Sequence, residues 1–263
     1  MKDSYIGVFD SGIGGLTVVK EIVRLMPNEN IIYLGDTAHV PYGTHSPEQI
    51  TEYALQDTKF LSAFNLKAIV IACNTVDSIA REAVDELCNV PVFGVVEPAS
   101  KVAANTTKNG KIGVIATNAT VNSRAYNKAI EKYNLKAEVI SVACPLLVPL
   151  IENGQFKKGD TVTRNVLKEY LDPLMKQEID TLILGCTHYT LLTEMIEDLY
   201  PNLMIVSSSI AVAKTIKASL PLSGNEQVDR RYFVSNNVED FKKLAQIFMG
   251  EVLTENIEQV QLG

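Results

Sequence analysis

The chain has 263 residues, of which 46% are hydrophobic and 21% charged, and 31 acidic against 24 basic side chains leave a formal net charge of −7. This composition is typical of a globular protein with one large domain or two. The acidic balance, without a run of basic residues, argues against a nucleic-acid partner. No stretch reaches the roughly 20 apolar residues of a membrane helix, and Asp3 stands where a signal peptide needs apolar residues, so we expect a cytoplasmic protein with no membrane partner.

Short aliphatic runs alternate with amphipathic stretches along the chain. The runs that predict buried parallel strands are 5–9, 30–34, 67–72, 90–96, 111–116, 137–142, 181–185 and 203–207. Apolar residues at helical spacing predict helices between them, for example over 76–87 and 191–199. We expect the segment 208–263 to be largely helical, with a short strand at Phe233-Val234, and to pack on the first half. This alternation predicts an α/β fold.

The two halves of the sequence resemble each other. Residues 66–75 (LKAIVIACNT) align without a gap on residues 179–188 (IDTLILGCTH), so Cys73 and Cys186 take equivalent places. Residues 6–11 resemble 112–117, and 40–41 resemble 148–149. We therefore predict two similar domains related by a pseudo-twofold axis, each a mainly parallel four-stranded sheet flanked by helices. The first domain comprises residues 1–98 plus 208–263, and the second comprises 99–207.

Polar side chains follow the predicted strands at their carboxyl ends, where open parallel sheets bind ligands. They are Asp10, Ser11, Asp36, Tyr42, Gly43, Cys73, Asn74, Thr75, Thr117, Thr120, Cys186, Thr187 and His188. If the two domains face each other, these side chains converge on one cleft.

Four cysteines in a chain of this length do not form a disulfide framework, so each is treated as a free thiol. Cys73 and Cys186 each precede a predicted helix, whose N-terminus lowers a thiol pKa. A thiolate and a thiol on opposite faces of one carbon can remove and deliver a proton, which inverts the stereochemistry. Each cysteine alone can equally be a small buried apolar residue, and that is our interpretation of Cys88 and Cys144.

The sequence DSGIGG at residues 10–15 predicts a turn between a strand and a helix. The backbone N–H groups of such a turn can hold a phosphate or a carboxylate. GxGxxG spacing and the Walker lysine are both missing, so a phosphate loop is not favoured. Asp10 can be a helix cap or a catalytic carboxylate, and the pattern alone leaves both open.

Five motifs in this order resemble those of the cofactor-independent glutamate racemases of the aspartate/glutamate racemase superfamily. They are FDSGIGGL at residues 9–16, GDT at 35–37, PYG at 41–43, ACNT at 72–75 and GCTHY at 185–189. The resemblance spans about residues 5–215. It implies an isomerase that interconverts L- and D-glutamate by a two-base mechanism, supplies D-glutamate for bacterial peptidoglycan, uses no cofactor and forms a homodimer.

The resemblance also implies individual roles. Cys73 takes the proton from D-glutamate with the help of Asp10, and Cys186 takes it from L-glutamate with the help of Glu152 and His188. The implied substrate contacts are Asp10, Ser11, Tyr42, Gly43, Asn74, Thr75, Thr117, Thr120, Thr187 and His188. From charge alone, we expect the substrate ammonium to pair with Asp10 and Asp36, and its carboxylates to accept from N–H and O–H groups.

The chain departs from the family pattern at three positions outside the cysteine pair. Thr190 replaces a usual proline, His39 a common arginine, and Ser207 an expected aspartate. Three alternatives stay open: a racemase of aspartate or another acidic amino acid, a zinc hydrolase with Cys73, Cys186 and His188 as ligands, and a non-catalytic anion-binding module. No lysine lies in a motif suited to a pyridoxal Schiff base, so we expect no pyridoxal cofactor and no metal.

Overall fold

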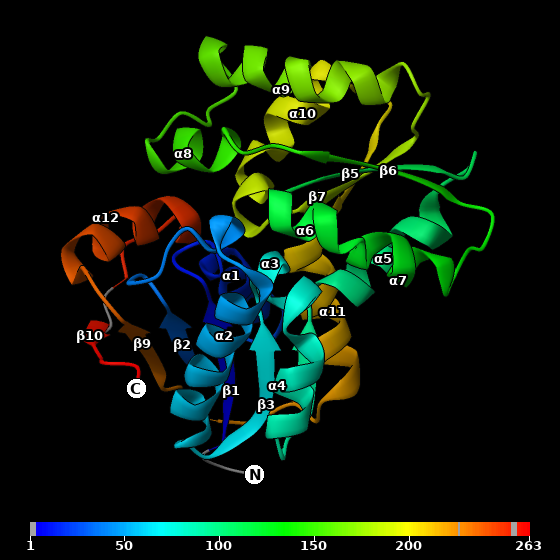
Figure 1. Cartoon of the computed structure of the whole chain (residues 1–263). Helices are drawn as coiled ribbons and strands as arrows, with labels where there is room; N and C mark the ends of the chain where they lie inside the picture. Colours follow the sequence, from blue (N-terminus) through cyan, green and yellow to red (C-terminus); the bar gives the residue numbers. More distant parts are fainter. Residues whose placement is uncertain (1–3, 226, 254–256) are drawn as a thin grey trace.

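The structure contains two parallel β-sheets, one in the upper half and one in the lower half of Figure 1. The computed structural model describes residues 4–225, 227–253 and 257–263. The lower sheet has six strands in the order β10-β9-β2-β1-β3-β4, and the upper sheet has four in the order β6-β5-β7-β8. All strand pairs described are parallel.

The lower sheet is buried on both faces, as its nearly unbroken aliphatic strands predict. Its strands are β1 (Tyr5–Asp10), β2 (Asn30–Gly35), β3 (Leu66–Ile71), β4 (Val92–Gly94), β9 (Arg230–Val234) and β10 (Ile257–Gln259). Side chains alternate between the faces, so Ile6 and Val8 enter one apolar core and Phe9 enters the other. One face packs on α1 (Leu16–Leu25), α11 (Ser208–Ser219) and α12 (Val238–Met249), and the other on α2 (Pro47–Ser62), α3 (Asn74–Ile79) and α4 (Arg81–Leu87).

The upper sheet has the same construction. Its strands are β5 (Lys111–Ala116), β6 (Glu138–Ala143), β7 (Thr181–Gly185) and β8 (Met204–Ser207). The helices around it are α5 (Val96–Thr106), α6 (Asn118–Ser123), α7 (Ala125–Glu131), α8 (Leu147–Glu152), α9 (Thr161–Met175) and α10 (Thr193–Leu199). Two short 3₁₀ helices, η1 (Tyr42–Thr44) and η2 (Thr187–Leu192), complete the described elements.

The predicted α/β class and the mainly parallel sheets are confirmed, and the two halves share a strand order. The order β2-β1-β3-β4 in the lower sheet corresponds to β6-β5-β7-β8 in the upper sheet. The expected count of four strands holds only for the upper sheet. The segment after residue 208 adds β9 beside β2, with Ile31 opposite Arg230, and β10 beside β9.

Local boundaries also differ from the sequence pattern. The helix expected over 76–87 is two helices, because the backbone leaves the helical region at Ala80 (φ −105°, ψ 4°). The helix expected over 191–199 begins as η2 and becomes α-helical only at Thr193. Among the residues the structure describes, there is no helix both long and apolar enough to cross a membrane.

Candidate active site

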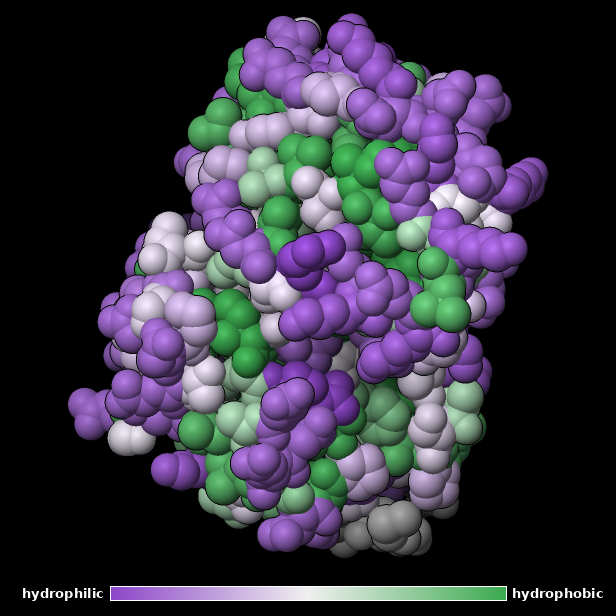
Figure 2. Space-filling model, turned by 45° about the vertical axis from the view of Figure 1, so that its right-hand side comes forward, coloured by the Kyte–Doolittle hydropathy of each residue, from purple (hydrophilic) through white to green (hydrophobic). Residues whose placement is uncertain are grey.

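A cavity of about 390 Å³ lies where the carboxyl ends of the two sheets face each other. In Figure 2, hydrophilic side chains gather along the waist between the two lobes of the molecule. Predicted site residues that line the cavity are Ser11, Tyr42, Gly43, Cys73, Asn74, Thr75, Thr117, Glu152, Cys186, Thr187 and His188. The topology therefore brings together motifs that are far apart in the chain.

Three residues that the sequence predicts to contact the substrate lie behind this lining. Asp10, Asp36 and Thr120 are almost wholly buried and are not part of the cavity wall. Thr120 contacts the lining through hydroxyl groups, because its Oγ1 lies 3.4 Å from Thr75 Oγ1 and 3.1 Å from Thr117 Oγ1. The Oγ1 atoms of Thr75 and Thr117 are 2.9 Å apart, and the Thr117 side chain caps the N-terminus of α6. This cluster presents neutral hydroxyl groups to the cavity.

Asp36 is fully buried outside the cavity wall and hydrogen-bonded to protein groups, which corrects the expectation that it pairs with a substrate ammonium. Its carboxylate accepts hydrogen bonds from Tyr42 Oη (2.5 Å), His39 Nδ1 (2.7 Å) and Ser235 Oγ (2.7 Å). Tyr42 therefore turns its hydroxyl away from the cavity that it lines. His39 also stacks on Tyr53, with the ring centroids 4.0 Å apart. Asp36 thus holds the loop that carries Tyr42 and Gly43.

Cys73 lies among acidic and hydroxyl groups of the lower half. It precedes α3, and its Sγ is 3.3 Å from Ser11 Oγ. Burial, and then the nearby Asp10 carboxyl, raise the pKa of the Cys73 thiol to about 12. The backbone N–H of Val76 in the first turn of α3 does lower this pKa, as expected for a helix N-terminus, but burial outweighs it and the net shift is upward. Cys73 carries its proton at neutral pH.

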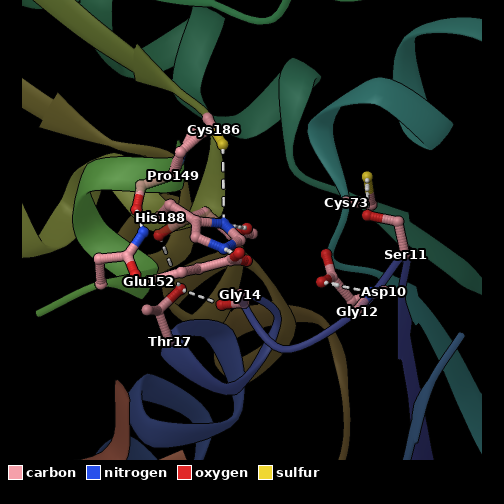
Figure 3. Close-up of polar contacts among 12 residues, drawn as sticks. Asp10, Ser11, Gly12, Gly14, Thr17, Cys73, Pro149, Glu152, Cys186 and His188 are labelled. Carbon is pink, nitrogen blue, oxygen red and sulfur yellow. Dashed lines mark hydrogen bonds and ion pairs between the residues drawn. The ribbon is translucent and has the colours of Figure 1, made fainter. Parts of the chain in front are cut away.

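Asp10 lies next to this thiol and is only partly hydrogen-bonded. Its Oδ2 accepts from the Gly12 N–H at 3.1 Å, whereas its buried Oδ1 has no hydrogen-bond partner among the described residues. Burial raises the Asp10 pKa, and the charge of His188 opposes that rise. Figure 3 shows the Asp10 carboxyl between the Cys73 side and the His188 side of the site.

Cys186 lies in a different environment, next to an imidazole. Its Sγ is 3.9 Å from His188 Nδ1, and His188 Nε2 is 2.9 Å from Glu152 Oε1 (Figure 3). Burial lowers the His188 pKa, but the hydrogen bonds to Cys186 and Glu152 outweigh burial and raise it to about 10. The imidazole is therefore a cation at neutral pH, and it places a positive charge next to the Cys186 sulfur.

Two of the three family departures contact each other. Ser207 Oγ accepts from the Ile210 N–H at 3.4 Å and so caps α11, as an aspartate at this position can. Thr190 Oγ1 is 3.4 Å from the same oxygen. Neither residue lines the cavity.

Sequence reasoning missed several lining residues. Among them are Val40, Asn118, Cys144, Pro145, Val148 and Pro149. The repeat contained the signal for Asn118, since it aligns with Gly12 of the first half. Cys144 is buried with its Sγ 3.6 Å from the Val142 carbonyl, and burial raises its pKa. Cys88 ends α4 and lies outside the cavity.

The zinc alternative requires two cysteines and a histidine to converge. Within residues 4–225, 227–253 and 257–263, no three His, Cys, Asp or Glu side chains are grouped so that they could hold a metal ion.

The family model described as Asp/Glu/Hydantoin racemase matches residues 6–215, which include both halves of the cavity and both cysteine motifs. The chain belongs to this racemase family.

Within the family, the similar proteins are glutamate racemases. The chain is 45% identical over 254 residues to the glutamate racemase of Sulfurihydrogenibium sp., covering 96% of both chains. It is also 45% identical to that of Neisseria gonorrhoeae over 264 residues, covering 98% of this chain and 97% of the relative. The structure of a Bacillus anthracis glutamate racemase superposes with a TM-score of 0.92 at 38% identity, with 100% of this chain and 99% of that one covered.

A glutamate racemase from Francisella tularensis, solved in complex with D-glutamate, gives a TM-score of 0.93 at 37% identity, with 100% of this chain and 99% of that one covered. An aspartate racemase from Picrophilus torridus gives only 0.57 at 20% identity, which shows a shared fold alone. The particular group to which this chain is most similar among these is therefore the glutamate racemases.

Proposed function

We propose that this protein is a glutamate racemase, which interconverts L- and D-glutamate and supplies D-glutamate for peptidoglycan. The observation that carries the proposal is the pair of buried cysteines, one from each half, on the wall of one cavity. Membership of the racemase family and the D-glutamate in the Francisella tularensis relative support it.

The reaction follows from where the protons are. Cys73 is a thiol at neutral pH, and the His188 imidazole beside Cys186 can stabilise the negative charge that this sulfur carries when it acts as the base. With L-glutamate bound, the Cys186 thiolate removes the Cα proton and the Cys73 thiol delivers its proton to the opposite face. D-glutamate then leaves behind a Cys73 thiolate and a Cys186 thiol. The reverse reaction starts from that second state. Before another turnover of L-glutamate, Cys73 must take up one proton and Cys186 must release one.

Neighbouring acid and base groups support each sulfur. Asp10 assists proton removal from Cys73, because its unpaired Oδ1 is a nearby acceptor. His188 stabilises the Cys186 thiolate, and Glu152 keeps His188 charged and oriented. All three are proposed to act through the sulfur atoms.

The remaining lining residues bind the substrate. In the described residues, the cavity wall contains no lysine or arginine, so its polar donors are hydroxyl, amide and backbone N–H groups together with the His188 imidazole. We assign the glutamate contacts to Ser11, Tyr42, Gly43, Asn74, Thr75, Thr117, Thr187 and His188, with Asp10 and Thr120 behind them. Such donors can stabilise the negative charge that develops when the Cα proton leaves, more strongly when water is excluded.

The test measures racemisation and solvent exchange together. Circular dichroism should show that the purified protein racemises L- and D-glutamate much faster than D-aspartate. In D₂O, Cys73→Ala should exchange the Cα proton of L-glutamate without racemising it, because Cys186 still removes and returns a proton on one face. Cys186→Ala should exchange only D-glutamate. Racemisation by either variant at the wild-type rate contradicts the two-cysteine mechanism, and preferred turnover of aspartate contradicts the substrate assignment.

The remaining expectations concern assembly and location. We propose a cytoplasmic homodimer, whose mass light scattering measures directly. We also propose domains of residues 1–98 plus 208–263 and 99–207, since strands of the lower sheet come only from 5–94 and 230–259. Small-angle scattering with and without D-glutamate tests whether these domains close on the substrate.

A further inference from the structure

Two consecutive buried serines at the start of α11 lie between the loops that carry the two cysteines. Ser208 Oγ donates to the Leu184 carbonyl at 3.2 Å and is 3.5 Å from the donor Asn74 Nδ2. Leu184 is two residues before Cys186, and Asn74 directly follows Cys73. One serine hydroxyl therefore contacts the backbone of β7, the strand that leads to Cys186, and the side chain at the start of α3, the helix that follows Cys73.

The second serine makes an analogous bridge. Ser209 Oγ is 2.9 Å from Thr17 Oγ1 on α1, and Thr17 Oγ1 is 2.9 Å from the Gly14 carbonyl and 3.3 Å from the Thr187 carbonyl. Thr187 directly follows Cys186, and Gly14 belongs to the turn that begins at Asp10. In Figure 3, Thr17 and Gly14 lie beneath His188.

The close approach at this bridge requires glycine. A Cβ atom on Gly14 would lie 2.2 Å from Thr187 Oγ1 and 2.5 Å from His188 Nδ1, which no side chain permits. The lower turn and the upper cysteine loop are therefore in direct contact. Asn74 is held from the upper half as well, because Tyr126 Oη on α7 donates to its Oδ1 at 2.6 Å.

These bridging groups are buried and separate from the substrate. Ser208 and Ser209 are 0% exposed and Thr17 is 3% exposed, and none of the three lines the cavity. α11 is also the second of the two connections between the sheets, following β8 directly. The bridge therefore lies where the chain returns from the upper half to the lower half.

We propose that Thr17, Ser208 and Ser209 are positioning residues that set the separation of the two reacting sulfur atoms across the halves. The proposal rests on the proposed racemase function. Two proton transfers to one carbon need both sulfurs at contact distance, and a misplacement of about 1 Å in such a site can cost on the order of 100-fold in rate. Substrate binding depends on lining groups that these residues do not include.

The variants remove hydroxyl groups without changing the cavity wall. Thr17→Val and Ser209→Ala each break the Ser209 bridge, and Thr17→Ser keeps the hydroxyl as a rescue. Thr58→Val is the matched control, because Thr58 is equally buried but its hydroxyl bonds only the Ala54 carbonyl of its own helix, at 2.6 Å. Ser209→Ala carries the test if Thr17→Val does not fold, since it removes the hydroxyl that lies 2.9 Å from Thr17 Oγ1.

The experiment measures kcat, KM, the primary isotope effect with Cα-deuterated glutamate, and the melting temperature. We expect Thr17→Val and Ser209→Ala to lower kcat by about 10- to 100-fold, to leave KM within about twofold, and to increase the isotope effect because proton transfer becomes rate-limiting. Thr17→Ser should restore kcat, and Thr58→Val should lose melting temperature without losing kcat.

Two results separate the proposals. A wild-type protein that does not racemise glutamate overturns the proposed function. An active wild type whose bridge variants match Thr58→Val in kcat and isotope effect overturns the positioning role alone.

Discussion

The two halves of the molecule share one strand order, yet they place their cysteines in opposite electrostatic surroundings. Near Cys73 lies the buried carboxyl group of Asp10, which forms a cluster with those of Asp36 and Asp57, and burial followed by Asp10 raises the Cys73 pKa to about 12. Beside Cys186 lies the His188 cation. The repeated fold therefore sets equivalent positions, whereas the side chains around them set different proton affinities.

This difference is compatible with a symmetric reaction. L- and D-glutamate have equal free energies in solution, so kcat/KM must be equal in the two directions whatever the enzyme. An asymmetric site can differ between directions only in kcat and KM separately. The unequal surroundings of the two cysteines should therefore be detectable in the free enzyme, without substrate.

The largest expected effect is on thiol labelling. Cys73 and Cys186 are similarly accessible, at 6% and 7% exposed. A pKa of about 12 leaves a thiolate fraction of about 10⁻⁵ at Cys73 at pH 7. Iodoacetamide at pH 7 should therefore alkylate Cys186 at least about 100-fold faster than Cys73, as followed by peptide mass spectrometry.

The internal control is His188→Ala, which should slow labelling of Cys186 and leave that of Cys73 unchanged. Equal labelling rates of Cys73 and Cys186 in the wild type would contradict the proposed difference between their surroundings.

A smaller effect is expected from Glu152→Gln. Its hydrogen bond helps to raise the His188 pKa to about 10, so the imidazole cation persists below that pH and is lost as the pH rises through it. Removing this carboxylate should move the alkaline limb of the kcat/KM profile about one pH unit lower, a loss of roughly twofold at pH 9 that approaches about tenfold near pH 11. An unchanged alkaline limb would assign that limb to another group.

The smallest effect concerns the stability of the carboxyl cluster. Asp57 is wholly buried, and neither of its carboxyl oxygens has a hydrogen-bond partner with good geometry among the described residues. Burial, followed by Asp36 and Asp10, raises its pKa well above the ordinary value against the opposing effect of the nearby Tyr42 hydroxyl. The folded state therefore holds this proton more tightly than the unfolded chain. The resulting stabilisation is complete below about pH 4 and decreases as the pH rises towards the folded pKa.

Urea unfolding between pH 5 and 8 measures this decrease. The free energy of unfolding of the wild type should fall relative to Asp57→Asn by up to about 1.4 kcal/mol per pH unit. Asp85→Asn, which removes an exposed carboxyl group, should run parallel to the wild type. Parallel curves for Asp57→Asn as well would mean that Asp57 titrates normally.

The strands and the internal repeat could be predicted from the sequence, because buried parallel strands are local aliphatic runs. The repeat around Cys73 and Cys186 also indicated that two distant motifs meet, and both line one cavity. β9 was predicted only as a short strand at Phe233-Val234, and β10 was not predicted at all. Both are short strands at one end of the sheet, where β9 pairs with β2 and β10 is the edge strand beside β9.

Other features depended on contacts between distant residues. From the sequence, Asp36 was expected to pair with an ammonium group. In the structure its carboxylate is hydrogen-bonded to Tyr42, His39 and Ser235. The serines at 208 and 209 had no pattern that suggested a bridge, since their partners are Leu184, Asn74 and Thr17.

The amino-acid sequence by itself determined the α/β class, the twofold repetition and the identity of the two thiols, because these depend on local hydrophobic pattern and on which reactive groups follow which strands. Only the tertiary structure decided that the Cys73 thiol holds its proton and which contacts fix the separation of the segments that follow Cys73 and Cys186. Desolvation, neighbouring charge and buried hydroxyl contacts depend on residues brought together from opposite ends of the chain.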